Sequence, residues 1–281
     1  MAQPDEELLK PWSAAAKYWE KHRDIIGKMF APATLALVEA AAIGRGSAVL
    51  DVGAGPGEPA LSIAALVGAD GRVCGIDPVA EMVAAARREA DRLRLGHAAF
   101  DVAFADQLPF PNATFDAAVS RFGAMYFPAP VAAVREMLRV LKPGGRLAMA
   151  VWHFAEFSPF LSLVPRVVDR YIAPEVLPPD APDTFRFATP GKLREIFAEA
   201  GVASPEERLL RFAMTVALTA EEVWTLRCEM SDKLRERLAT LPPDALAQLK
   251  AEAIEGLREY ATDGGMSFPA EVWIVSGTRP R

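Results

Sequence analysis

Between residues 44 and 152, short apolar runs alternate with longer segments in which apolar residues recur at helical spacing. The first run, Ala48 to Val52, is apolar except for Asp51, which indicates a strand buried on both faces of a parallel sheet. The strands that this pattern predicts cover residues 48–52, 71–77, 98–105, 115–120 and 146–152, and the helices between them cover 60–67, 79–93 and 130–141. Alternation of this kind is typical of an α/β domain.

Helical patterns dominate both ends of the chain. Ser13 is placed to cap a helix that runs to about Phe30, after a loose polar start over residues 1–12, and a second helix is predicted over 32–42. Residues 153–189 are rich in prolines and aromatic residues, with one helix near 162–171. The remaining predicted elements are a helix over 191–200, a strand over 206–218, amphipathic helix over 221–260 with a break at 241–243, and a last strand over 270–278.

Composition narrows the class of protein. With 281 residues, of which 51% are apolar, the chain can bury a sizeable core. Its formal net charge of -6, without a basic block, argues against nucleic acid as a partner. Cys74 and Cys228 lie far apart without nearby histidines, so neither a metal site nor a disulfide framework is expected. Because the first residues lack signal-peptide features and no apolar run approaches the roughly 20 residues of a membrane span, we expect a cytoplasmic, soluble protein.

A glycine-rich turn follows the first buried strand. Gly53, Gly55 and Gly57 stand at alternate positions, and Asp51 lies two residues before the first of them. Between a strand and a helix, such a turn lets a ligand approach backbone N–H groups closely, because no Cβ atoms stand in the way. The dinucleotide fingerprint is G-x-G-x-x-G, in which the third glycine comes one residue later than here. The spacing in this chain therefore departs from that fingerprint.

An acid also ends the second predicted strand. Asp77 lies roughly 20 residues after the glycine turn, where a carboxylate accepts hydrogen bonds from both hydroxyls of a ribose. Pro78 opens the next helix, and Met82 lies one turn into it, where it is placed near an adenine ring. Nicotinamide enzymes share this acid, so Asp77 indicates an adenosine ligand without deciding which one.

Two further motifs occur at the ends of predicted elements. A-D-Q-L-P-F at 105–110, with Phe115-Asp116 after it, follows the third strand, and R-V-L-K-P-G-G at 139–145 leads into the fifth. In order and spacing, these motifs and the glycine turn resemble those of class I S-adenosylmethionine-dependent methyltransferases. The resemblance is close over residues 45–152. It is strongest to the methyltransferase type 11, quinone-biosynthesis-like branch, whose members methylate small molecules.

The resemblance implies S-adenosyl-L-methionine as the cofactor, S-adenosyl-L-homocysteine as the product, and no metal. In the family, the glycine turn packs beneath the methionine half of the cofactor, and the acid at the strand end, here Asp51, orders that turn. The carboxylate of Asp106 is expected to accept from the adenine amine, which needs an acceptor in an apolar slot. The expected cofactor-binding residues are Tyr18, Trp19, Asp51, Gly53, Ala54, Gly55, Gly57, Asp77, Pro78, Met82, Ala105, Asp106, Gln107, Ser120, Arg121 and Phe122.

The same resemblance implies the fold and its division. We expect an α/β, Rossmann-like, seven-stranded and mostly parallel sheet with helices on both faces, an antiparallel last strand and helical cap insertions. Residues 1–43 are expected to be helices that cover the cofactor, and 44–152 the cofactor-binding core. Residues 153–189 form an insertion at the acceptor pocket, and 190–281 complete the core with a helical cap at about 219–265.

The expected partner is a small, largely apolar methyl acceptor, because the aromatic content of 153–189 favours a hydrophobic pocket. Tyr126, Trp152 and Phe154 are the expected substrate-binding residues. Methyl transfer from a sulfonium mainly needs orientation of the acceptor. An acceptor with a tightly held proton also needs a general base, for which His153 is the first candidate and Glu156 and His22 are others.

Two alternatives remain open at this point. One is an NAD(P)-dependent oxidoreductase on a related sheet, which the glycine spacing and the lack of a Tyr-x-x-x-Lys motif disfavour. The other is a non-catalytic protein that binds the cofactor and uses the cap to engage a protein partner. The acceptor, the methylated atom and the oligomeric state do not follow from the sequence.

Overall fold

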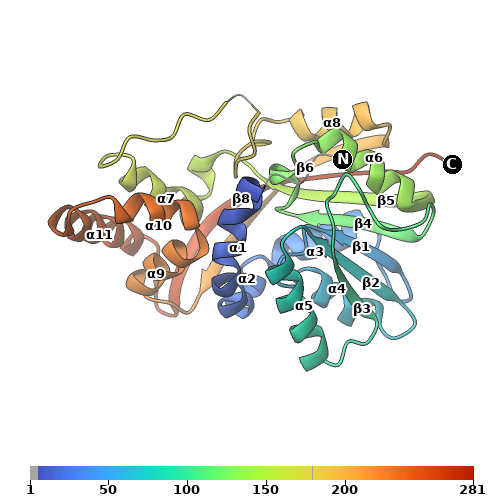
Figure 1. Cartoon of the computed structure of the whole chain (residues 1–281), viewed down its shortest axis with the longest axis horizontal. Coiled ribbons are helices and arrows are strands. Elements are labelled where there is room, and N and C mark those ends of the chain that lie inside the picture. Colours follow the sequence, from blue (N-terminus) through green and yellow to red (C-terminus); the bar gives the residue numbers. More distant parts are fainter. Residues whose placement is uncertain (1–5, 179) are drawn as a thin grey trace.

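A computed structural model describes residues 6–178 and 180–281 and contains one mixed β-sheet (Figure 1). Its strands are β1 (Ala48–Val52), β2 (Arg72–Asp77), β3 (Ala98–Val102), β4 (Phe115–Arg121), β5 (Leu141–Trp152), β6 (Ala203–Val216), β7 (Ala261–Thr262) and β8 (Gly265–Thr278). The order across the sheet is β3-β2-β1-β4-β5-β8-β6, with β7 paired to β8. Strands β1 to β5 are parallel and β8 is antiparallel to both of its neighbours. The predicted fold class is therefore confirmed, with the two-residue β7 as an addition.

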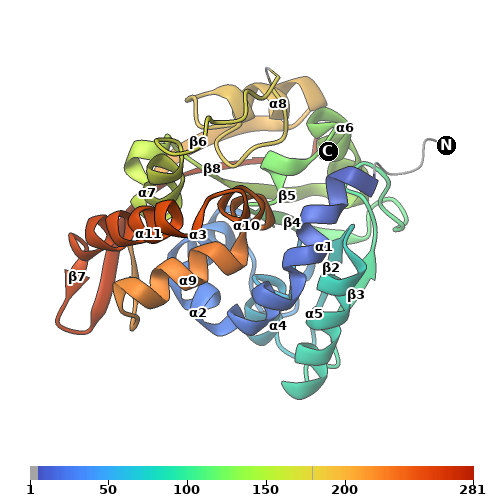
Figure 2. The same cartoon turned by 60° about the vertical axis from the view of Figure 1, so that its left-hand side comes forward.

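The helices lie on both faces of the sheet and in a separate group beside it (Figure 2). They are α1 (Glu6–Lys21), α2 (Arg23–Met29), α3 (Ala31–Ala40), α4 (Ala60–Val67), α5 (Ala80–Arg92), α6 (Pro130–Val140), α7 (Pro159–Val168), α8 (Lys192–Ala200), α9 (Ala220–Met230), α10 (Asp232–Ala239) and α11 (Pro243–Arg258). No helix of the described ranges is both long and apolar enough to cross a bilayer.

The strand order places a crevice between β1 and β4. From β1 the chain moves outward to β2 and β3, whereas from β4 it moves in the opposite direction to β5. Because β-α-β crossovers are right-handed, α4 and α5 cover one face of the sheet and α6 covers the other. Ligands bind at such a reversal, outside the carboxyl ends of the strands. The glycine turn follows β1 at this edge, and the segment from Phe122 follows β4.

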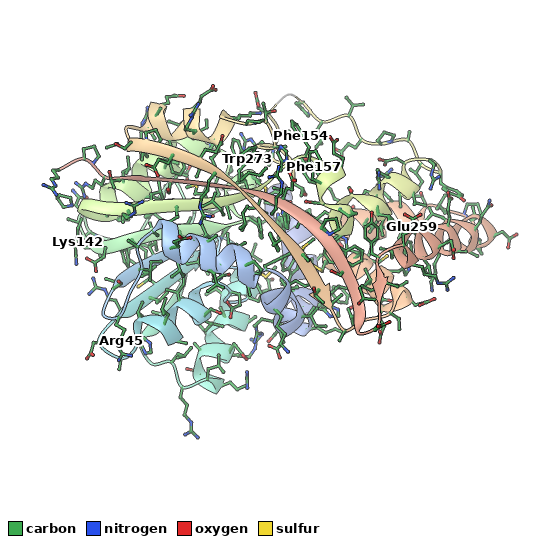
Figure 3. The ribbon with its side chains drawn as sticks, turned by 180° about the vertical axis from the view of Figure 1, so that it is seen from behind. Arg45, Lys142, Phe154, Phe157, Glu259 and Trp273 are labelled. Atoms are coloured by element: carbon green, nitrogen blue, oxygen red, sulfur yellow. The ribbon has the colours of Figure 1, made fainter. Side chains whose placement is uncertain are left out.

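The strands β6 and β8 form a long antiparallel ribbon. Their pairing runs from Ala203 opposite Thr278 to Val216 opposite Met266. Seen from behind, the ribbon continues past the parallel strands and curves toward the helices of the cap (Figure 3). Helices α9, α10 and α11 are inserted between its two strands. We call these three helices the cap.

The N-terminal helix differs from the prediction. Within the part of residues 1–12 that the structure describes, 6–12 are helical, so Ser13 lies inside α1 and caps nothing; residues 1–5 lie outside the described ranges. A break at His22 separates α1 from α2. The reason is tertiary packing: Trp12 and Trp19 pack against a buried cluster that contains Val79 and Met82. That apolar contact favours a helix that begins earlier than its polar start suggests.

Two boundaries inside the core also differ from the prediction. The third strand ends at Val102 instead of Ala105, so Ala105 and Asp106 lie in the loop after it. The fifth strand begins at Leu141, and the Gly144–Gly145 pair lies within it, where Gly144 has φ +78°. A Cβ at Gly145 would lie 2.9 Å from the carbonyl oxygens of Asp116 and Lys142, which explains why only glycine fits this close approach.

The packing of β2 against β3 gives a test of the core. We expect Gly75→Ala to reduce the free energy of unfolding by about 1–3 kcal/mol, because the added Cβ would lie 2.5 Å from the Phe100 ring and 3.0 Å from Ala54. Urea unfolding measures the change. Gly96→Ala is the matched control, since that position is exposed and no heavy atom lies within 4 Å of an added Cβ. Equal stability of both variants would contradict the described packing.

Candidate functional site

A cavity of about 470 Å³ lies at the carboxyl ends of the parallel strands. Its walls come from α1 and α2, the glycine turn, the loops after β2, β3 and β4, the end of β5, and α9 of the cap. Most of the residues that line it are apolar. Eight of them are aromatic: Trp12, Trp19, Phe30, Phe104, Phe122, Tyr126, Phe127 and Trp152. Apolar walls with a few convergent polar groups are typical of sites for small molecules and cofactors.

The glycine turn forms the floor of the cavity. Gly53 and Gly55 have φ of +78° and +53°, a region that favours glycine. The N–H groups of Gly53 and Ala54 both donate to the carbonyl oxygen of Ile76, at 2.8 and 2.9 Å, which ties the turn to β2. A Cβ at Gly53 would lie 3.2 Å from the Cα of Gly123, whereas one at Gly55 would meet nothing within 4 Å. Gly53 thus allows the turn to pack closely against Gly123, and Gly55 leaves its backbone open to a ligand.

Asp77 lies beside this turn and lines the cavity. Its Oδ2 accepts from the N–H of Gly55 at 2.9 Å, and its Oδ1 accepts from the N–H of Val79 at 3.0 Å. Burial raises the pKa of Asp77 to about 6, although these two N–H groups oppose the shift. Each carboxylate oxygen keeps acceptor capacity after one such bond. Asp77 therefore holds the turn and can still accept from a ligand.

Asp51 is fully buried beneath the turn and does not line the cavity. Its Oδ2 accepts from the N–H of Ala60 at 3.1 Å, so it joins β1 to the first turn of α4. Its Oδ1 has no hydrogen-bond partner among the described residues. Burial raises the pKa of Asp51 to about 7, against the opposing charge of Arg121. Asp51 therefore ties β1 to α4, on either side of the glycine turn, and does not border the cavity.

The segments that follow β2 and β3 also line the cavity. Pro78, Met82, Ala105 and Asp106 all line it, as expected from the sequence. Met82 is buried against Val79 and the aromatic side chains of α1. Gln107, in contrast, is exposed and lies outside the lining, as do Gly57 and Ser120. These three predicted residues are neighbours of the site without bordering its open space.

The segment after β4 brings Arg121 and Phe122 into the cavity wall. Arg121 is buried; its Nη1 donates to Thr34 Oγ1 at 2.7 Å and its Nη2 to the carbonyl oxygen of Glu58 at 3.2 Å. Phe122 has φ +61°, a conformation that is rare for a bulky residue and that costs energy. Its ring stacks on Trp152 with centroids 4.1 Å apart and an interplanar angle of 8°. This stack holds a strained residue at the site.

A second aromatic pair also lines the cavity. Tyr126 contacts Trp12 edge-on, with centroids 4.7 Å apart, and its hydroxyl forms a hydrogen bond of 2.8 Å with Thr184. Burial raises the pKa of Tyr126 to about 12, so the phenol is neutral at physiological pH. Two of the three predicted substrate-binding residues, Tyr126 and Trp152, thus line the cavity.

The structure places His153 and Phe154 elsewhere, which corrects their expected positions. His153 Nδ1 lies 2.9 Å from Glu271 Oε2, and its ring packs against Phe154, Phe157 and Trp273 at 4.8–4.9 Å. The three aromatic side chains gather on the back of the molecule in Figure 3. The cause is strand alternation: Trp152 points into the cavity, so the next residue points to the opposite face.

The other candidates for a base are also outside the lining. Glu156 lies in a 3-10 turn after β5, and His22 Nε2 pairs with Glu229 Oε2 at 2.5 Å. None of the three histidines of the chain lines the cavity. Tyr18 does not line it either, because its ring lies under the guanidinium of Arg235, 4.8 Å away.

Sequence reasoning missed many of the residues that line the cavity, among them Trp12, Arg23 and Arg227. Arg23 Nε donates to the carbonyl oxygen of Pro56 at 3.0 Å, and its Nη1 pairs with Glu89 at 2.6 Å, so it binds α2 to the glycine turn. Nothing local in the sequence marks Arg23. Arg227 had a signal: it stands between Val223 and Met230 in an i, i+4, i+7 stripe that is otherwise apolar.

Comparison with known proteins identifies the family to which this chain belongs. A family model described as a methyltransferase domain matches residues 49–145. The chain is 35% identical over 183 residues to the ubiquinone/menaquinone biosynthesis C-methyltransferase UbiE of Azotobacter vinelandii, an alignment that covers 62% of this chain and 70% of that protein. The chain belongs to the class I S-adenosylmethionine-dependent methyltransferases.

Other relatives agree with this assignment. The UbiE protein of Cellvibrio japonicus is 39% identical over 136 residues, which are 48% of this methyltransferase and 53% of that protein. Among solved structures, phosphoethanolamine N-methyltransferase 2 of Haemonchus contortus, in complex with S-adenosylhomocysteine, shares the fold with a TM-score of 0.52 and 19% identity. That match covers 88% of this methyltransferase and 52% of the solved chain. Because the chain belongs to this methyltransferase family, the alternative of an NAD(P)-dependent oxidoreductase is no longer supported.

The raised pKa of Asp51 predicts a pH dependence of stability. Between its ordinary value of 3.8 and about 7, the folded methyltransferase binds more protons at this site than the unfolded chain does. The free energy of unfolding therefore falls as pH rises through this window. We expect Asp51→Asn to remove a fall of the order of 3 kcal/mol between about pH 5 and about pH 8, measured by urea unfolding at both values.

Asp116→Asn is the control for this measurement. Burial raises the pKa of Asp116, but Lys142 and the N–H of Ala48 outweigh it, and the pKa lies below 3.8. Its contribution to stability is fully present above the unfolded-state value and is lost only in more acidic solution. The effect of Asp116→Asn is therefore the same at both pH values. A pH dependence unchanged by Asp51→Asn would show that Asp51 is ionised in the folded protein.

Proposed function

We propose that the cavity binds S-adenosylmethionine across the crevice between β1 and β4, with adenosine at the β2–β3 side and the methionine half on the glycine turn. The observation that carries this proposal is the position of Asp77. Its carboxylate ends β2, lines the cavity and is held rigidly by the N–H groups of Gly55 and Val79. The residues fit a ribose at this point, because the carboxylate keeps lone pairs for two hydroxyl donors.

The neighbouring groups support the rest of the proposed orientation. Met82 and Ala105 offer apolar surface to an adenine ring, and Asp106 offers an acceptor for its amine. Gly55 leaves its side of the turn open, which suits the close approach of the methionine half. Phe122 and Trp152 present aromatic faces, which attract a cation such as a sulfonium by about 0.5–2 kcal/mol.

When bound, S-adenosylmethionine supplies an activated methyl group, so the work of this chain is to orient the acceptor and exclude water. Helix α1 and the cap close over the strand ends, where Trp19 Nε1 donates to the carbonyl oxygen of Met230 at 3.2 Å. Holding an acceptor in line in this way accounts for about 7–11 kcal/mol of barrier lowering. None of the candidate bases His22, His153 and Glu156 lines the cavity, and an acceptor that is already a good nucleophile needs none of them.

We further propose a planar, largely apolar acceptor of the quinol type, methylated on carbon. The stacked pair of Phe122 and Trp152 and the edge-on pair of Trp12 and Tyr126 give the cavity flat apolar walls on two sides. The names of the two UbiE relatives state C-methylation in ubiquinone and menaquinone biosynthesis. Residues 153–189 and the cap at 219–265 would then supply the roof over that acceptor.

Cofactor binding is tested by calorimetric titration with S-adenosylhomocysteine, with NAD and NADP in parallel. We expect micromolar binding of S-adenosylhomocysteine alone, and Asp77→Ala to weaken it by at least about 1 kcal/mol, roughly fivefold, because a buried acceptor is lost. Asp101→Ala is the matched control, since Asp101 is exposed on β3 and pairs with Arg87. Binding of NAD in place of S-adenosylhomocysteine, or an unchanged affinity in Asp77→Ala, would overturn the proposed site.

The acceptor class is tested by transfer of a labelled methyl group to a panel of compounds. Substituted hydroquinones represent flat apolar acceptors, and ethanolamine phosphate and glycine represent small hydrophilic ones. We expect product only with the first group, because flat rings fill the aromatic walls while hydrophilic compounds lose hydration there. Transfer to hydrophilic acceptors alone would refute the apolar acceptor.

A further inference from the structure

One cation of the cavity wall differs from the others. Arg227, in α9, is only 8% exposed and lines the cavity from the side of the cap. It lies on the helix face that also buries Val223 and Met230. Since burying a charge is costly unless the charge is paired, the partners of this guanidinium show whether the folded chain satisfies it.

The described residues give Arg227 few partners. Its Nη2 donates to the carbonyl oxygen of Leu161 at 3.3 Å, and the guanidinium lies 5.1 Å from the centre of the Phe160 ring. Its Nε is buried and has no hydrogen-bond partner among the residues described. No carboxylate of the described chain lies within 4.0 Å of this guanidinium. A carbonyl and a ring face do not neutralise its charge.

The other cationic side chains that line the cavity have acidic partners nearby. Arg23 pairs with Glu89 at 2.6 Å, and Lys233 pairs with Glu175 at 3.3 Å. Arg121 has two oxygen acceptors and the nearby acids Glu58 and Asp51. The ionisable neighbours of Arg227 are Tyr126 and Cys228, and burial raises their pKa values to about 12 and about 11, so both are neutral at physiological pH.

We propose that Arg227 binds an anionic oxygen of the methyl acceptor, a carboxylate or an ionised hydroxyl, while the apolar body of the acceptor lies against the aromatic walls. This inference rests on the proposed function and specifies the acceptor as an aromatic compound with one oxyanion. Guanidinium groups suit this role because their N–H donors match planar oxyanions. An ionised hydroxyl on an aromatic ring is also the kind of nucleophile that needs no histidine.

The test uses probes of one shape and different charge. The 281-residue protein, saturated with S-adenosylhomocysteine, is titrated at about pH 8 with 2-naphthoate, with its neutral counterpart 2-naphthamide, and with 2-naphthol. Quenching of tryptophan fluorescence reports binding, because Trp12, Trp19 and Trp152 line the cavity. We expect naphthoate to bind about tenfold or more tightly than naphthamide. Tighter binding of naphthol as pH rises through its ionisation would show that the anion is a hydroxyl.

The variant Arg227→Met tests whether Arg227 causes the preference for naphthoate over naphthamide. We expect the naphthoate preference to fall to within about twofold, and Arg227→Lys to keep part of it, because the charge remains without the planar donors. Arg258→Met is the control of equal charge change on the exposed side of the cap, where Arg258 pairs with Glu221. Loss of the preference in Lys233→Met with Arg227→Met unaffected would overturn the inference.

Two further outcomes separate this inference from other roles of Arg227. If Arg227→Met weakens S-adenosylhomocysteine as strongly as naphthoate, Arg227 holds the cofactor and the inference is wrong, although the proposed function stands. If it lowers the thermal midpoint and leaves the naphthoate preference intact, Arg227 is only a structural donor to Leu161, and the inference is again wrong. Failure of the wild-type protein to bind S-adenosylhomocysteine would refute the proposed function itself.

Discussion

The site depends on one carboxylate that joins three pieces of backbone. Asp77 ends β2 and accepts from the N–H of Gly55 in the glycine turn and of Val79 before α5. The turn is thereby held at the carboxyl ends of β1 and β2, where Ile76 also accepts from two of its N–H groups. Because each glycine of the turn has unusual conformational freedom, these fixed acceptors decide its shape. The floor of the cavity follows from that shape.

The sequence predicted the parallel core closely, because its signals are local. A buried strand, a glycine turn and a helix follow one another, and the structure has β1 at Ala48–Val52 and α4 at Ala60–Val67, as predicted. The misplaced features depend on contacts between distant segments. Helix α1 begins before Ser13 because Trp12 and Trp19 pack on α5, and His153 turns away from the cavity because Trp152 turns toward it.

The roof of the cavity shows the same limit of sequence reasoning. It joins α1 and α2 to a cap more than 200 residues later, through Trp19 with the carbonyl oxygen of Met230 and through Lys21 and His22 with Glu229. No local pattern predicts such pairings, because the two partners lie more than 200 residues apart in the sequence. The apolar stripe around Arg227 did carry a usable sign, a charge on a helix face that is otherwise buried.

The ribbon of β6 and β8 connects the cap to the parallel core but keeps the two parts structurally separate. The cap is attached at the end of this antiparallel ladder that extends past the carboxyl end of β5 (Figure 1). Strands β4 and β5 separate the ribbon from β1 and β2, which carry the glycine turn and Asp77. Insertions or substitutions between its two strands alter the roof while the floor keeps its own hydrogen bonds. Such a division allows residues 219–265 to change without rebuilding the parallel core.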